Sequence, residues 1–253
     1  MTTDDEDTPE RKTTWREHAV EWAKTIAGAF LAYLAFTTVA FANYRIPSES
    51  MVPHLEVGDR VVVSKFAYGY SRFSLPLNLG FMLPRSQHRF LERLPRRGDV
   101  AVFIHPRTGI VMIKRAIGLP GDTIEVRGGA LWINGEAAAT TEPVLLMRER
   151  YQQGREWARR SEETLPNGYT HSVHDLAPDE PLDEFGPFVV PAGHIFFMGD
   201  NRDNSLDSRW DGMGSVPVEN LIGRAEIVYA TRSCSGNPTL SCPMDRWMQP
   251  LHH

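Results

Sequence analysis

The sequence has few cysteines and lacks the short motifs of common metal and nucleotide enzymes. Only Cys234 and Cys242 occur among its 253 residues, and they do not form a C-x-x-C pair. It contains no H-E-x-x-H segment and no Walker A loop, which excludes zinc fingers, zincins and P-loop enzymes. A formal net charge of -5 argues against a general nucleic-acid binder. We therefore expect no metal and no cofactor.

Turn-forming residues are abundant, with 20 glycines and 18 prolines beside 42% hydrophobic residues. This composition disfavours a helical bundle and is typical of a folded, turn-rich β protein. Short apolar runs follow Gly-Asp, Pro-Gly or Gly-Gly turns, which predicts a mainly β, antiparallel body. The predicted strands lie in residues 58–69, 96–106, 110–135, 193–200 and 223–230.

One long stretch, Thr25–Tyr44, carries no charge, and Lys24 and Arg45 flank it. As a helix of about 1.5 Å per residue it would span the roughly 30 Å hydrocarbon core, so we favour a transmembrane anchor. A buried core helix is the alternative in a soluble protein. A cleaved signal peptide is another, because Ala40-Phe41-Ala42 is an A-x-A pattern, although the preceding region is long and acidic.

Basic residues predict the orientation of this anchor. Four Lys or Arg residues precede the stretch, and only Arg45 and Arg60 follow it within about fifteen residues. The positive-inside rule then places residues 1–24 in the cytoplasm as a polar tail. Residues 45–253 form the body on the outer side.

Residues 140–187 differ from the rest of the body and read as an insertion, or a small second lobe. The segment 148–163 is highly charged, and we interpret it as a surface helix. Residues 178–187 form an acidic, turn-rich loop. A solvated surface explains this composition better than a binding site does.

Three polar segments are candidates for chemistry. Ser48 and Ser50 lie two apart, so in an extended chain both hydroxyls point the same way. Lys114 lies in an apolar strand, where desolvation favours a neutral amine that can act as a general base. Residues 199–209 form a dense polar run that needs an internal hydrogen-bond network or a ligand. Each segment also has another interpretation. The serine segment could be an ordinary linker, Lys114 an edge-strand lysine, and residues 199–209 resemble a calcium loop superficially.

Taken together, the segments resemble type I signal peptidase, a family of serine–lysine proteases. The matching text is IPSESMVPHLEVGDRVVVSKFAYG, RRGDVAVF, IKRAIGLPGD and GDNRDNSLDSR, in that order and behind an apolar stretch. The resemblance implies a β-rich body on the outer face of the bacterial inner membrane, held by a retained anchor. Its substrates would be signal peptides of secretory preproteins, cut after small residues.

The resemblance also implies roles for individual residues. Ser50 matches the nucleophile and Lys114 the general base, while Ser48 and the Ser50 backbone N–H match the oxyanion donors. The remaining matches are support for the dyad by Ser205, Asp200, Asp207 and Arg209, and substrate contacts by Ile46, Pro47, Met51, Val102 and Ile113. Glu49, His54 and Met112 depart from residues that are frequent in the family and affect the expected pocket shape.

Two other functional classes are alternatives to a signal peptidase. A self-cleaving serine–lysine regulator of the SOS-repressor type shares the dyad, but the anchor and the lack of a helix-turn-helix argue against it. A membrane-anchored interaction domain would leave the four matching polar residues unexplained. Outside the cytoplasm, Cys234 and Cys242 could form a disulfide. Phe81-Met82-Leu83 and Trp247-Met248 are candidates for contact with membrane lipid or for core packing.

Overall fold

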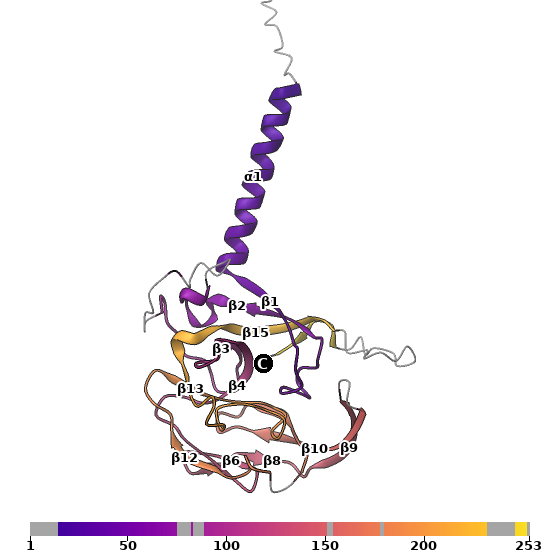
Figure 1. Ribbon diagram of the computed structural model, residues 1–253, viewed down its shortest axis with the longest axis vertical. Helices are drawn as coiled ribbons and strands as arrows, with labels where there is room; N and C mark the ends of the chain where they lie inside the picture. Colours follow the sequence, from indigo (N-terminus) through magenta and orange to yellow (C-terminus); the bar gives the residue numbers. More distant parts are fainter. Residues whose placement is uncertain are drawn as a thin grey trace, which may run out of the picture.

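A computed structural model describes residues 15–74, 82, 89–150, 154–177, 180–231 and 246–251. Its N-terminal helix α1, Trp15–Val39, stands clear of a β-rich body (Figure 1). Within the described residues, one helical stretch, Trp15–Phe36, is long and apolar enough to cross a membrane, and none of it is buried in the body. The predicted class, a mainly β body behind an N-terminal apolar helix, is confirmed.

The helix differs in its bounds from the expected segment Thr25–Tyr44. It begins earlier, at Trp15, and so includes Glu21 and Lys24, which form an ion pair of 3.1 Å within one helical turn. It ends at Val39, because Phe41–Arg45 is strand β1. This strand pairs antiparallel with β2, Arg60–Ser64, so its backbone hydrogen bonds belong to the sheet. The absence of charge in Thr25–Tyr44 could not show where the helix ends and strand β1 begins.

Strands are the main regular structure of the body, and each predicted apolar run contains at least one, although Lys65–Tyr68 in the run 58–69 is a 3-10 helix. After β1 and β2 come β3 Val100–Ile104, β4 Val111–Gly118, β5 Thr123–Arg127, β6 Ala130–Ile133, β7 Glu136–Ala137, β8 Ala139–Thr140, β9 Val144–Arg150, β10 Gly154–Thr164, β11 Thr170–Asp175, β12 Phe185–Val189, β13 His194–Met198, β14 Val216–Pro217, β15 Leu221–Ala230 and β16 Gln249–Pro250. Short 3-10 helices span Lys65–Tyr68, Arg72–Ser74 and Val218–Asn220.

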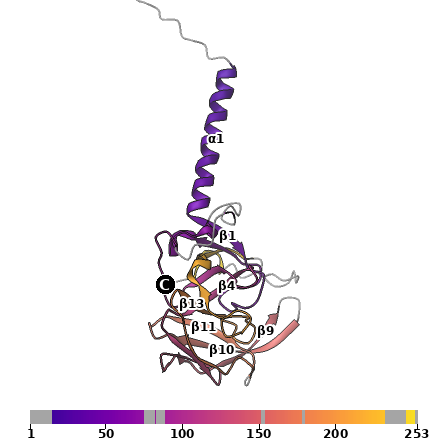
Figure 2. The same ribbon diagram turned by 60° about the vertical axis from the view of Figure 1, so that its left-hand side comes forward.

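These strands form three sheets. The largest has the order β1-β2-β15-β3-β4-β13-β14, with β16 paired to β15. A second contains β8 to β11, and a third has the order β12-β5-β6-β7. Ladder pairings among the described strands are antiparallel, and a single parallel bridge joins His174 to Asn201. The second sheet lies at the lower end of the body, opposite α1 (Figures 1 and 2).

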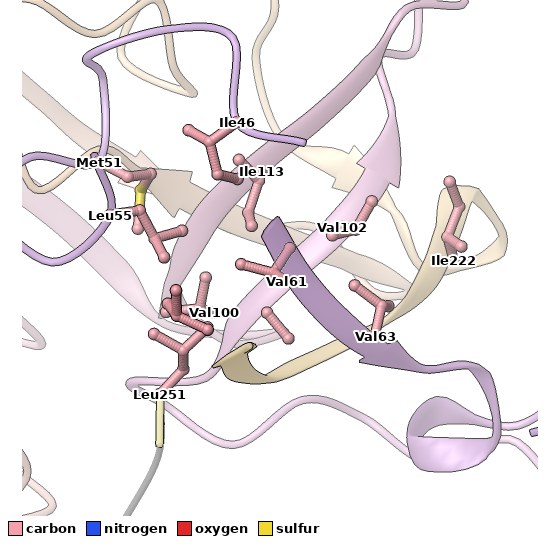
Figure 3. Packing of buried hydrophobic residues seen from close by; sticks show 12 residues of the cluster. Ile46, Met51, Leu55, Val61, Val63, Val100, Val102, Ile113, Ile222 and Leu251 are labelled. Atoms are coloured by element: carbon pink, nitrogen blue, oxygen red, sulfur yellow. The ribbon is translucent and has the colours of Figure 1, made fainter. Parts of the chain in front are cut away.

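The core of the large sheet lies directly beneath the loop that follows β1. It contains Met51 and Leu55 from that loop, together with Val61, Val100 and Ile113 from the strands (Figure 3). All of these side chains are at most 8% exposed. Burial of a side chain of this size contributes about 1.5–3 kcal/mol, so the core fixes where the loop can lie.

The interpretation of residues 148–163 as a surface helix is wrong. Residues 148–150 and 154–163 belong to the antiparallel strands β9 and β10, in which Arg148 lies opposite Glu156. Charged side chains on one face of this hairpin pair with one another across the strands. Cross-strand pairing of this kind stabilises a sheet despite a composition that favours helix. The charge alternation therefore reflects strand pairing, which local propensity does not detect.

Candidate active site

The first part of the site is the turn after β1, which carries Ser48 and Ser50. Ser50 is buried at 6% exposure, Ser48 is exposed, and their Oγ atoms lie 3.4 Å apart. The backbone is a turn rather than the extended chain expected, since Val52 N–H donates to the Glu49 carbonyl at 3.1 Å. Both hydroxyls nevertheless lie on one side of the turn.

The second part is Lys114, which extends from the middle of β4. Its Nζ donates a hydrogen bond to Ser50 Oγ, although the two residues are 64 positions apart. Lys114 is 3% exposed, and burial lowers its pKa to about 8, while Asp207 and Asp200 oppose this shift. A lysine near this pKa has a neutral fraction at neutral pH and can accept a proton from the hydroxyl it contacts.

Two buried ion pairs neutralise the carboxylates around Lys114. Arg115 binds Asp200 through two bonds, Nε to Oδ1 at 2.8 Å and Nη2 to Oδ2 at 2.6 Å. Arg209 binds Asp207 in the same way at 3.0 and 2.9 Å. Burial alone would raise the pKa of both carboxyls, but the arginines hold it low, at about 2 for Asp200. The arginine charges thus balance the carboxylates that would otherwise favour a charged lysine.

The loop of residues 199–209 is also attached to the Ser50 backbone. Asn201 N–H donates to the Ser50 carbonyl at 3.2 Å, and Asn201 Nδ2 donates to the Glu49 carbonyl at 3.1 Å. A side chain on Gly199 would collide with the Ser50 carbonyl and with Ser205. The close approach therefore requires glycine here. Ser205 itself is buried, 3% exposed, and packs against Gly199.

Four of the five expected substrate contacts lie together in the core cluster under the loop. Ile46, Met51 and Val102 are 0–1% exposed and Ile113 is 8% exposed. Figure 3 shows the four side chains within the cluster. Pro47, the fifth, is exposed beside Ser48. Their substrate role stays a prediction.

Sequence reasoning did not single out Arg115 or Asn201 as site residues. Both stand inside segments that were noticed, so the segments themselves carried the signal. Of the expected lipid contacts, Met82, Trp247 and Met248 are exposed. Phe81 and Leu83 lie outside the described residues, as do Cys234 and Cys242.

Three histidines lie where the second sheet meets the site. His171 and His174 belong to β11 and are buried, and His54 follows the Ser50 turn. Burial lowers the pKa of His54 and of His174 to about 4, and nearby arginines add to the effect. Burial and Arg115 also hold the pKa of His171 well below its ordinary value. The folded protein therefore keeps these imidazoles neutral.

We expect the free energy of unfolding to fall as the pH drops from about 6.5 towards 4. In that window the unfolded chain binds protons that the folded chain does not, at up to about 1.4 kcal/mol per pH unit and histidine. Urea titrations of the full chain in detergent, from pH 4.5 to 7.5, measure this slope. His174→Gln should lower the slope by about one proton, and an unchanged slope would contradict this assignment.

The chain is similar in sequence to hydrolases of the serine endopeptidase class. The family described as "Signal peptidase, peptidase S26" matches residues 19–230. Signal peptidase I of Rickettsia bellii (strain OSU 85-389) is 35% identical over 83% of this chain and 73% of its own length. Signal peptidase I of Pseudomonas aeruginosa is also 35% identical, over 83% of this chain and 72% of its length.

The chain belongs to this signal peptidase family, whose activity is the removal of signal peptides by a serine protease. The same membership argues against the SOS-type regulator and the interaction domain. A solved signal peptidase I from Enterococcus faecalis V583 is 29% identical and covers 52% of this chain and 97% of its own, with a TM-score of 0.32.

Proposed function

We propose that this protein removes signal peptides by cutting after small residues at A-x-A type sites, with Ser50 as nucleophile and Lys114 as general base. The observation that carries the proposal is the hydrogen bond from buried Lys114 Nζ to Ser50 Oγ. A nucleophile within reach of a base of lowered pKa is the general signature of covalent catalysis.

In the proposed first step, Ser50 Oγ attacks the scissile carbonyl carbon while neutral Lys114 takes the hydroxyl proton. Lys114 then gives that proton to the leaving amine, and an acyl-enzyme remains on Ser50. The leaving amine is the new N-terminus of the mature protein, and the acyl group on Ser50 is the signal peptide. A water molecule then attacks the ester with Lys114 again as base, which releases the signal peptide with a free carboxylate and restores the serine.

Ser48 Oγ and the Ser50 backbone N–H are the proposed donors to the oxyanion. The 3.4 Å between the hydroxyl oxygens of Ser48 and Ser50 supports this role for Ser48. Asp200, Asp207, Arg209 and Ser205 support the dyad by holding the loop of residues 199–209 against it. Removal of one oxyanion donor typically costs about 10²–10³ in rate.

The proposed setting is the bacterial inner membrane, with the N-terminus in the cytoplasm and the body on the outer side. The exposed helix α1 supports anchoring. Exposed Met82, Trp247 and Met248 are the proposed contacts with lipid. Residues 140–187 remain the proposed insertion, and their strands β9 to β11 form the second sheet together with β8.

Cleavage of a purified preprotein with an A-x-A site, in detergent or lipid, tests the proposed specificity. We expect one cut, after the second alanine, because the small residues at −1 and −3 are the recognised feature. Mass spectrometry of both products locates the cut, and a preprotein with a bulky residue at −1 is the control. A folded enzyme that leaves the first substrate intact, or cuts both equally, would contradict the proposal.

A further inference from the structure

The second sheet reaches the site through two arginines of β9. Arg148 Nη2 lies 3.3 Å from Glu49 Oε2, and Arg150 Nε lies 3.4 Å from the same oxygen. Asn204 Nδ2, from the loop of residues 199–209, donates to it at 3.3 Å. Three side chains from two distant segments therefore converge on one carboxylate oxygen, and that carboxylate belongs to the residue between Ser48 and Ser50.

This contact is largely shielded from solvent and balanced in charge. The side chains of Glu49 and Arg148 are 11% and 8% exposed, and that of Arg150 is 27% exposed. Glu156 of β10 pairs with both arginines, at 3.3 Å for Arg150. Two arginines thus meet two carboxylates. Removing one partner of a shielded ion pair destabilises the structure, because the remaining charge stays desolvated and uncompensated.

Strand geometry explains why both arginines face the same way. Residues two apart on a strand share a face, so Arg148 and Arg150 lie together with Glu156, which is opposite Arg148 in the ladder. The opposite face of the hairpin carries Arg155 and Trp157, and both are exposed. The register therefore places the arginines that touch Glu49 on the face that carries Glu156, and Arg155 on the opposite face.

We propose that Arg148 and Arg150 are positioning residues, which hold Glu49 so that Ser50 faces Lys114 with Ser48 beside it. This inference rests on the proposed function and assigns a role to the inserted segment. Glu49 lies between the two serines in the chain. A carboxylate held from the hairpin limits rotation of the turn about its backbone, and that rotation would carry both hydroxyls away from Lys114.

The expected cost follows from how sharply catalysis depends on orientation. A shift of about 1 Å in a reacting group can lower a rate about 100-fold. We expect Arg148→Met to lower kcat for preprotein cleavage about 10- to 100-fold, with KM changed less than about threefold. The pKa of Lys114, measured from the pH dependence of kcat, should not move, because the charges that act on Lys114 are those of Asp207 and Asp200.

A double-mutant cycle separates this role from a general effect on the fold. Glu49→Ala and Arg148→Met should each cost at least tenfold in kcat, whereas Arg148→Met should cost less than about twofold in the Glu49→Ala background. Arg148→Lys should restore part of the rate. Arg155→Met, on the opposite face of the same hairpin, is the matched control and should cleave at the wild-type rate.

A second measurement does not depend on preprotein binding, and it is made together with a check that the variants are folded. The rate of Ser50 acylation by a small serine-directed inhibitor should fall in Arg148→Met as kcat does, while circular dichroism at the assay temperature stays unchanged. Additive losses in the cycle, or unchanged acylation in a folded variant, would overturn the positioning role. The proposed function is tested separately, because wild type that cuts and Ser50→Ala that does not would uphold it whatever the cycle gives.

Discussion

Ser50→Ala is expected to abolish preprotein cleavage while leaving the protein folded. Ser50 Oγ is the hydroxyl that Lys114 contacts, so its removal eliminates the proposed covalent intermediate. Loss of a serine nucleophile from such a unit typically costs about 10⁶ in kcat, and a residual rate remains from binding and the oxyanion donors. The measurement is single-turnover cleavage with excess enzyme, followed by gel and mass spectrometry.

The fold should survive this change because the backbone contacts of residue 50 do not involve the hydroxyl. The Ser50 carbonyl accepts from Asn201 N–H at 3.2 Å, and alanine keeps that bond. Ser48→Ala is the matched control, since it removes the neighbouring hydroxyl and should cost only about 10²–10³. Ser50→Ala protein that retains a few per cent of the wild-type rate would exclude Ser50 as the nucleophile.

Loss of the Lys114 base is expected to have the second-largest effect on kcat. In the wild type, protonation of Lys114 should produce the same loss of activity at low pH. With the Lys114 pKa at about 8, the neutral amine is about a tenth of the population at pH 7. The logarithm of kcat should therefore rise with a slope of one below pH 8 and level off above it. Protonation removes the base, so activity is lost as the pH falls through the folded-state pKa.

Two substitutions of Lys114 separate its shape from its basicity. Lys114→Met keeps most of the volume and should lower kcat about 10²–10⁴-fold at every pH. Lys114→Arg keeps a positive charge that does not dissociate in this range and should be equally inactive. The measurement is kcat from pH 6 to 10 in buffers of constant ionic strength. A flat wild-type profile, or a rising limb that persists in Lys114→Met, would assign the titration to another group.

The strands and the chemistry-bearing segments could be predicted from sequence because each is a local signal. Apolar runs between turn residues correctly located the strand of Lys114 and its neighbour β3, which follows Gly98-Asp99. The meeting of Lys114 with Ser50 could not come from spacing, since 64 residues and a sheet crossover separate them. There the family resemblance supplied what periodicity could not.

The errors occurred where tertiary contacts decide the structure. The hairpin of β9 and β10 is charged enough for a surface helix, and its pairing across its own strands, with β11 and with β8 makes it part of a sheet. The end of α1 is similar, because residues 41–44 are uncharged enough for a membrane span and form a strand only because they pair with β2. Neither partner is visible in the local sequence.

The join between α1 and β1 has a consequence for how substrates reach the enzyme. Only Ala40 separates the helix from a strand of the large sheet, and Ser50 follows that strand by five residues. A tether this short has little conformational freedom, so with α1 in a membrane it would hold Ser50, the proposed nucleophile, at a nearly constant height above the lipid surface. Encounter with a membrane-bound preprotein then becomes a search in two dimensions. We infer that the selection of a cleavage site depends on its distance from the bilayer as well as on the residues around it.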